Sequence, residues 1–229
     1  MNDIAPRNRP LLLGHRGARA LKSIPENTFS SFDRALEDGC DGFEFDVRLT
    51  ADGAAVICHD PRFQGIEIAG TRSRQLSELP RLDEALARYQ GRAFLDIELK
   101  VAGLQRHVVS ALRDSPPGRG FVVSSFLPEA LRELRALDPA IPLGLICEKR
   151  DQLRWWMDLP AEYLIPHQKL VNSALVRQLK SVGKRVLVWT VNDSARMIRF
   201  RDSGVDGIIS DDTHLLCQTL SGNGKPRVS

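Results

Sequence analysis

The chain has 229 residues, of which 42% are hydrophobic and 27% are charged, with a formal net charge of +3. This composition is ordinary for a globular protein, and no segment approaches the roughly 20 continuous apolar residues of a membrane span, so we expect no stable membrane insertion. The small net charge, without a basic run interleaved with aromatic residues, argues against a nucleic-acid partner.

The N-terminal segment is mostly polar until the apolar run that begins at residue 11. It lacks the apolar core and the cleavage site of a secretory signal peptide, so we expect a cytoplasmic protein. The four cysteines are scattered and form no CxxC pair, which argues against a zinc site or a redox motif. The sequence leaves the oligomeric state open.

From residue 11 onward, short β-rich runs alternate with helical patterns, which is typical of βα units around a parallel sheet. Such barrels of roughly 200 to 250 residues form one domain. We therefore predict a TIM (β/α)₈ barrel as a single domain over 1–229, with 221–229 as a frayed tail. The predicted strands are 11–14, 41–47, 55–59, 93–100, 120–126, 142–147, 163–166, 185–191 and 207–210.

Two of these strands, 41–47 and 55–59, are separated by the turn signal TADG. They are therefore expected to form one excursion from a single barrel position. The first helix is predicted to begin after Asn27 as its N-cap and to end at Gly39, because Phe29, Phe32 and Leu36 recur at helical spacing between them.

Acidic residues occupy two predicted strands where a buried strand should be apolar. Glu44 and Asp46 share one face of the strand 41–47, and Glu98 lies on the corresponding face of 93–100, because side chains alternate along a strand. That face is the barrel interior, where carboxylates must be paired or bound to a metal. Three carboxylates suit a hard cation, Mg²⁺ or Ca²⁺ with Mn²⁺ as an alternative, whereas an interior salt-bridge cluster with Arg16 and Lys100 is the competing structural interpretation.

Two histidines favour the metal site over the salt-bridge cluster. His15 follows the apolar strand 11–14, and His59 ends the run 55–59, so both are placed at the C-terminal ends of strands, where barrel enzymes carry their active sites. A pair of imidazoles beside a metal-bound phosphate fits general acid–base catalysis, with Arg16 and Lys100 stabilising charge on the phosphate. These residues together indicate cleavage of a phosphate ester.

Six short motifs then point to a family. They are HRG at 15–17, PENT at 25–28, EFDV at 44–47, HD at 59–60, ELK at 98–100 and WTVN at 189–192. In this order and spacing the chain resembles the glycerophosphodiester phosphodiesterases over nearly its whole length. The resemblance implies a barrel enzyme that hydrolyses glycerophosphodiesters, its small-molecule substrates, to sn-glycerol 3-phosphate and an alcohol.

The resemblance also implies roles for single residues. Its implied metal ligands are Glu44, Asp46 and Glu98, its acid–base pair is His15 and His59, and its phosphate-binding cations are Arg16 and Lys100. Trp189 is implied as an apolar wall for the glycerol, although a core aromatic at a strand end would look the same. PENT is expected mainly to turn the chain and cap the first helix, so Glu26 and Asn27 receive no catalytic role.

The chain differs from many of these enzymes in having a shorter insertion between His59 and the strand that holds Glu98. The alcohol side of the substrate is therefore less defined by the sequence. Two alternatives stay open: a lipid-directed phosphodiesterase of the phospholipase C or D type on the same barrel, and a non-catalytic barrel that binds a phosphate ligand.

Overall fold

The structure is a computed structural model that describes residues 9–221 of the chain. Eight parallel strands form a closed barrel, because β1 pairs with β11 on one side and with β2 on the other. The predicted TIM barrel is therefore confirmed. In their order around the barrel the strands are β1 (Leu11–His15), β2 (Gly42–Leu49), β6 (Phe94–Leu99), β7 (Phe121–Ser125), β8 (Leu143–Cys147), β9 (Tyr163–Pro166), β10 (Arg185–Val188) and β11 (Gly207–Ser210).

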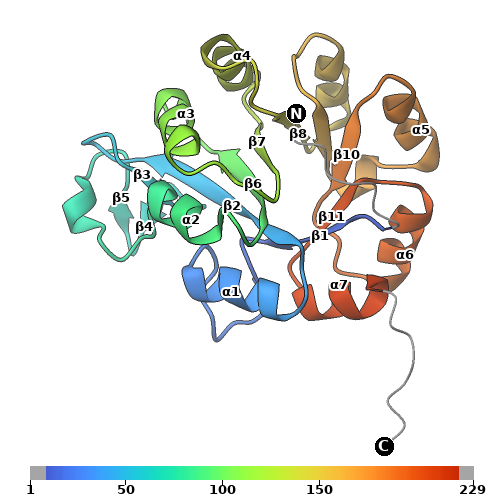
Figure 1. Ribbon diagram of the computed structural model, residues 1–229, viewed down its shortest axis with the longest axis horizontal. Helices are drawn as coiled ribbons and strands as arrows, with labels where there is room; N and C mark the ends of the chain where they lie inside the picture. The colour runs from blue at the N-terminus through green and yellow to red at the C-terminus, as the bar shows by residue number, and fades with distance from the viewer. Residues whose placement is uncertain (1–8, 222–229) are drawn as a thin grey trace, which may run out of the picture.

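Helices surround the outside of the barrel, as Figure 1 shows. The α-helices are α1 (Phe29–Glu37), α2 (Leu82–Tyr89), α3 (Gln105–Asp114), α4 (Pro128–Leu137), α5 (Ser173–Ser181), α6 (Ser194–Asp202) and α7 (Thr213–Leu220). Between β8 and β9 the connection is a 3₁₀ helix, η2 (Arg150–Met157), and shorter 3₁₀ turns are η1 (Ser73–Gln75) and η3 (Gln168–Leu170). None of the described helices is long and apolar enough to cross a membrane.

The segment 55–59 does not supply a barrel strand. β3 (Ala55–Ile57) runs antiparallel to the far end of β2, with Val47 opposite Ile57, so the two form a hairpin that extends from one barrel position. The expected single excursion is confirmed. It continues through a small hairpin, β4 (Arg62–Phe63) and β5 (Ile66–Glu67), which lies at the left of Figure 1.

The alternation of side chains along the strands produces two apolar layers. Outward residues of β2, such as Phe43 and Phe45, pack against Phe32 of α1 and Tyr89 of α2, and the rings of Phe32 and Phe43 stack at 4.3 Å. Inward residues fill the barrel, and this inner cluster contains Leu11, Leu13, Phe94, Val122, Ile146, Tyr163, Ile165, Leu187 and Ile209. The acidic residues of β2 and β6 interrupt the inner layer.

The start of α1 differs from the sequence-based expectation. Thr28, and not Asn27, is the N-cap, because the Thr28 side chain accepts a hydrogen bond from the backbone N–H of Ser31. Asn27 has a φ of 58° and turns its side chain toward the barrel. The predicted helix end is confirmed, since Gly39 has a φ of 102°, which glycine adopts at little cost. Of the predicted tail at 221–229, all but Ser221 lies outside the described residues.

Candidate active site

Three buried carboxylates meet inside the barrel. The strand register places Asp46 of β2 beside Glu98 of β6, and Glu44 beside the last residue of β1, His15. One carboxylate oxygen from each of Glu44, Asp46 and Glu98 lies within 4.8 Å of the other two. The cluster predicted from the alternation of two separate strands is therefore formed.

Two cations accompany these acids. Lys100 Nζ lies 2.8 Å from Glu98 Oε1 and 3.3 Å from Asp46 Oδ1, while Arg16 Nε lies 3.2 Å from Asp46 Oδ2. Asp46 thus lies between both cations, whereas Glu44 has contact with the backbone N–H of Arg16 at 3.0 Å. These salt bridges do not exclude a metal ion at the same place, because three acids face only two cations.

The pKa values follow from this placement. Burial, together with the charge of Asp46, raises the pKa of Glu44 well above its ordinary value, and the same two causes raise the pKa of Glu98 to about 7. Burial would also raise the pKa of Asp46, but Lys100 and Arg16 outweigh it and the pKa is lowered. An additional positive charge among these oxygens would therefore stabilise the ionised form of all three acids.

The donor set fits a divalent cation. Glu44 Oε1 is buried and has no hydrogen-bond partner within residues 9–221, and a buried unpaired carboxylate oxygen is costly unless something binds it. Three carboxylate oxygens at this spacing match the ligands that Mg²⁺ and Ca²⁺ prefer. The acidic triad can therefore hold a divalent metal ion, and these residues alone leave its identity open.

The two predicted histidines reach the site by different routes. His15 ends β1, and its Nε2 lies 3.8 Å from Glu44 Oε2 while its Nδ1 lies 2.7 Å from Asp211 Oδ1. His59 does not follow a barrel strand as expected: it follows the antiparallel β3, which runs back toward the barrel, so that Cys58 N–H donates to Asp46 O. Both histidines line the same cavity, because the hairpin of β2 and β3 brings His59 back to the end of the barrel where β1 ends.

This cavity has a volume of about 310 Å³ and is lined by both polar and apolar side chains. The polar and charged ones are His15, Arg16, Glu44, His59, Asp96, Glu98, Lys100 and Glu148, and the apolar ones are Phe126, Ile146, Ile165, Trp189 and Ile209. Trp189 is held at the wall, because its Nε1 donates to Ile165 O at 2.9 Å and its ring meets Phe126 edge-on. A molecule that carries both a phosphate and a carbon skeleton would match this mixed lining.

Comparisons with known proteins agree with this chemistry. Residues 15–108 and 96–215 match the model of the glycerophosphoryl diester phosphodiesterase family. The chain belongs to that family. The resemblance deduced from the six motifs, and with it the expectation of a phosphodiesterase, is confirmed.

Similar proteins within the glycerophosphoryl diester phosphodiesterase family match over most of their length. A glycerophosphodiester phosphodiesterase of Caldanaerobacter subterraneus is 29% identical over 250 residues, covering 94% of this chain and all of that protein (100%). A phosphodiesterase of Oleispira antarctica, solved with the product sn-glycerol-3-phosphate, has a TM-score of 0.81 at 27% identity and is covered over 96%, with 92% of this chain. A glycerophosphodiester phosphodiesterase of Parabacteroides distasonis has a TM-score of 0.81 at 27% identity, covering 93% and 98% of the two chains.

Two residues of the PENT motif in this family member have contacts at the site that the sequence pattern did not predict. Asn27 Nδ2 donates to Asp46 Oδ2 at 2.8 Å, so Asn27 supports a candidate metal ligand. Glu26 Oε1 accepts from Arg16 Nη1 at 2.7 Å and so holds a candidate phosphate-binding cation. Their polarity was visible in the sequence, but helix capping explained it equally well, because the contacts with β2 and with the β1 loop arise only after folding.

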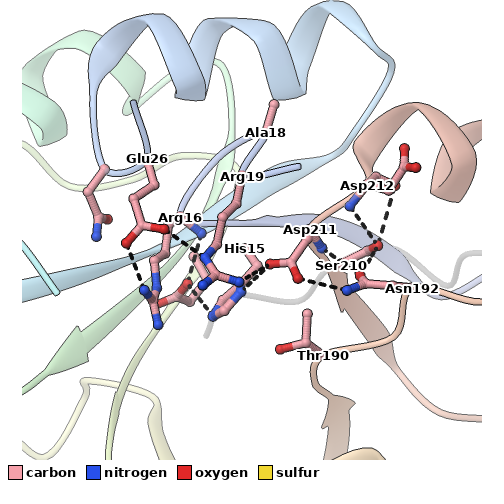
Figure 2. A network of polar contacts seen from close by, with 12 residues as sticks. His15, Arg16, Ala18, Arg19, Glu26, Thr190, Asn192, Ser210, Asp211 and Asp212 are labelled. Carbon is pink, nitrogen blue, oxygen red and sulfur yellow. Dashed lines mark hydrogen bonds and ion pairs between the residues drawn. The ribbon is translucent and has the colours of Figure 1, made fainter. Parts of the chain in front are cut away.

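A third residue of this phosphodiesterase whose role the sequence did not predict is Asp211, directly after β11. Besides His15, Asp211 binds Asn192, whose Nδ2 donates to Asp211 Oδ2 at 2.7 Å, as Figure 2 shows. Burial would raise the pKa of Asp211, but the hydrogen bond from His15 and the charge of that ring lower it. Asp211 ends the segment GVDGIISD at 204–211, but only barrel closure places β11 beside β1 and reveals its partner.

Proposed function

We propose that this chain hydrolyses glycerophosphodiesters to sn-glycerol 3-phosphate and an alcohol, with His15 and His59 as the acid–base pair. The single observation that supports this most is the cavity lined by both histidines, both cations and two acids of the carboxylate triad, Glu44 and Glu98, with Asp46 buried beside them. The family match narrows the reaction to phosphoric diester hydrolysis, and the product bound to the Oleispira antarctica relative suggests the glycerol phosphate half of the substrate.

In this proposal Arg16 and Lys100 bind the non-bridging phosphate oxygens. Both side chains are mostly buried, so their charges act at a lower dielectric than in bulk water. Burial would lower the pKa of Lys100, but Glu98 and Asp46 outweigh it and raise the pKa, so the ammonium group stays protonated at neutral pH. Trp189 and the isoleucines beside it pack against the carbon atoms of the glycerol.

The two histidines divide the proton transfers. One imidazole removes a proton from the nucleophile that attacks phosphorus, which is water or the 2-hydroxyl of the glycerol. The other imidazole protonates the alkoxide that leaves phosphorus. His59 suits this exchange because burial lowers the pKa of its ring, with the charge of Asp46 opposing that effect, so a neutral imidazole is available near pH 7. His15 is held with its Nδ1 toward Asp211, which leaves Nε2 for the cavity side.

We propose Glu44, Asp46 and Glu98 as the ligands of one divalent cation, Mg²⁺ or Ca²⁺, with Mn²⁺ as an alternative. Such a cation, when bound, would neutralise charge on the phosphate oxygens. We further propose that the whole chain acts as one domain. The cytoplasmic location expected from the N-terminal sequence stays a prediction.

The test is an assay of purified protein with glycerophosphocholine and glycerophosphoethanolamine, each with Mg²⁺, Ca²⁺ or Mn²⁺ and with EDTA. We expect release of sn-glycerol 3-phosphate that EDTA abolishes and that added metal restores. Release of phosphocholine would favour a phospholipase C type of cleavage. No turnover of any diester with any of the three ions would contradict the proposal.

A further inference from the structure

Arg19 connects two carboxylates on opposite sides of the loop that follows β1. Its Nε lies 2.7 Å from Glu26 Oε2, and its Nη1 lies 3.1 Å from Asp211 Oδ1. Glu26 belongs to the segment before α1, whereas Asp211 follows β11 at the closure of the barrel. Arg19 is not among the residues that line the active-site cavity, so its guanidinium acts on neighbouring side chains.

Each of these two carboxylates also binds a residue of the proposed active site. Glu26 Oε1 accepts from Arg16 Nη1 at 2.7 Å, and Asp211 Oδ1 lies 2.7 Å from His15 Nδ1. Figure 2 shows the resulting continuous chain of contacts from Arg16 through Glu26, Arg19 and Asp211 to His15. His15 and Arg16, the two ends of this series of contacts, are adjacent in the sequence, but different carboxylates hold their side chains.

We propose that Arg19 is a positioning residue of the active site, which fixes His15 through Asp211 and Arg16 through Glu26. The inference rests on the proposed function, because it assigns Arg19 a role in aligning the acid–base histidine with the phosphate-binding arginine.

The backbone conformation of Arg16 supports a need for such positioning contacts. Arg16 has a φ of 52°, a left-handed conformation that non-glycine residues adopt at a cost and that the surrounding contacts must maintain. The neighbouring side chains of His15 and Arg16 contact separate partners, Asp211 and Glu26. If Arg19 is removed, Glu26 and Asp211 each lose one cation and are less restricted in rotation.

Arginine is suited to this task. Its planar guanidinium donates through several N–H groups in a fixed fork, so that it can bind two carboxylates at once, whereas a lysine ammonium is a point charge on a flexible stem. The Arg19 side chain is 36% exposed, and ion pairs at that exposure contribute little to stability. We therefore expect its effect in catalysis and not in the free energy of unfolding.

The first test measures steady-state kinetics of Arg19→Met and Arg19→Lys. We expect kcat to fall about 10- to 100-fold in Arg19→Met, the range for loss of a residue that orients a functional side chain, with much less change in KM. Arg19→Lys should recover part of the loss. The matched control is Arg88→Met, which removes an arginine that pairs with Asp33 on the helical layer, and it should leave kcat unchanged.

Three results would overturn the inference: wild-type kcat in Arg19→Met, an equal loss in Arg88→Met, or a loss in Arg19→Met that simply adds to the loss in Glu26→Gln when both are combined. Residues that act through one contact are expected to be non-additive.

A second readout does not depend on activity. Long-range ¹H–¹⁵N spectra of the histidine rings should show shifted His15 signals in Arg19→Met, with His107 and His214 unchanged because they lie outside this chain of contacts. If wild-type protein turns over no diester, the proposed function fails and this spectrum still decides the inference. Unchanged His15 signals would then contradict the positioning role.

Discussion

His15 Nδ1 lies 2.7 Å from Asp211 Oδ1, so a carboxylate after the last barrel strand orients a histidine at the end of the first. Such a bond selects one ring orientation and directs Nε2, the other nitrogen, toward Glu44 and the cavity. The geometry of His15, one of the two histidines proposed for acid–base catalysis, therefore depends on the closure of the barrel between β1 and β11.

Replacement of Asp211 tests this dependence. We expect Asp211→Ala to lower kcat about 10- to 100-fold, because the ring of His15 loses its acceptor. Asp211→Asn should lose less, since an amide oxygen can still accept from Nδ1–H. The control is Asp212→Ala, which removes the N-cap of α7 and should cost about 1 kcal/mol of stability at unchanged kcat. Equal kcat values in Asp211→Ala and wild type would disprove the orienting role.

The histidines themselves should separate catalysis from metal binding. His15→Ala and His59→Ala are each expected to lower kcat by about 10²- to 10⁴-fold, the usual contribution of general acid–base catalysis. Divalent metal affinity, measured by calorimetry, should be nearly retained because the carboxylate triad is intact. His107→Ala is the control on a distant helix. Near-normal turnover in either variant would remove that histidine from the mechanism.

Asn27 and Thr28 are neighbours with different expected effects. Asn27→Ala removes the donor to Asp46 Oδ2 and should weaken divalent metal affinity about 10- to 100-fold, as for other residues that support a ligand. Thr28→Ala removes the true N-cap of α1 and should cost about 1 kcal/mol of unfolding free energy with metal affinity unchanged. Unchanged metal affinity in Asn27→Ala would contradict the proposed support of Asp46.

Stability should depend on pH through Asp52, in the turn between β2 and β3. Hydrogen bonds from Thr50 Oγ1 and from Ser73 lower the pKa of Asp52 to about 2. Because the folded pKa is below the unfolded one, about 3.9, this stabilisation is present above pH 4 or so and is lost as the pH falls toward about 2. Urea unfolding at decreasing pH should therefore show a gap between wild type and Asp52→Asn that narrows below about pH 4. A gap of constant size would contradict this origin.

Gly42 sets the approach of β2 to β6. A Cβ at this position would lie 1.8 Å from the backbone oxygen of Phe94, so the strands would have to separate. Gly42→Ala should cost about 4 kcal/mol or more, or prevent folding, as expected for severe overpacking at a backbone contact. Gly91→Ala is the matched control, because a Cβ there meets no atom within 4 Å, and its thermal unfolding should stay close to that of wild type.

Local sequence patterns were sufficient for the barrel and for most of the candidate site. Alternation along two strands placed Glu44, Asp46 and Glu98 on the inner face, because the period of a strand is fixed by backbone geometry. Gly39, which has a positive φ in the structure, marked where the first helix ends. The turn TADG marked the hairpin that carries His59 back to the barrel.

Only the tertiary structure revealed how the working residues are held. Asn27 and Asp211 bind groups that are distant in sequence, whereas Glu26 binds Arg16 across the loop that follows β1. These contacts depend on the φ of single residues and on the closure of β1 against β11. Strand period is a local property that the sequence expresses directly. Contacts between loops arise from the packing of the whole barrel, so the sequence by itself determined which residues face the cavity, and the fold decided which neighbours orient them.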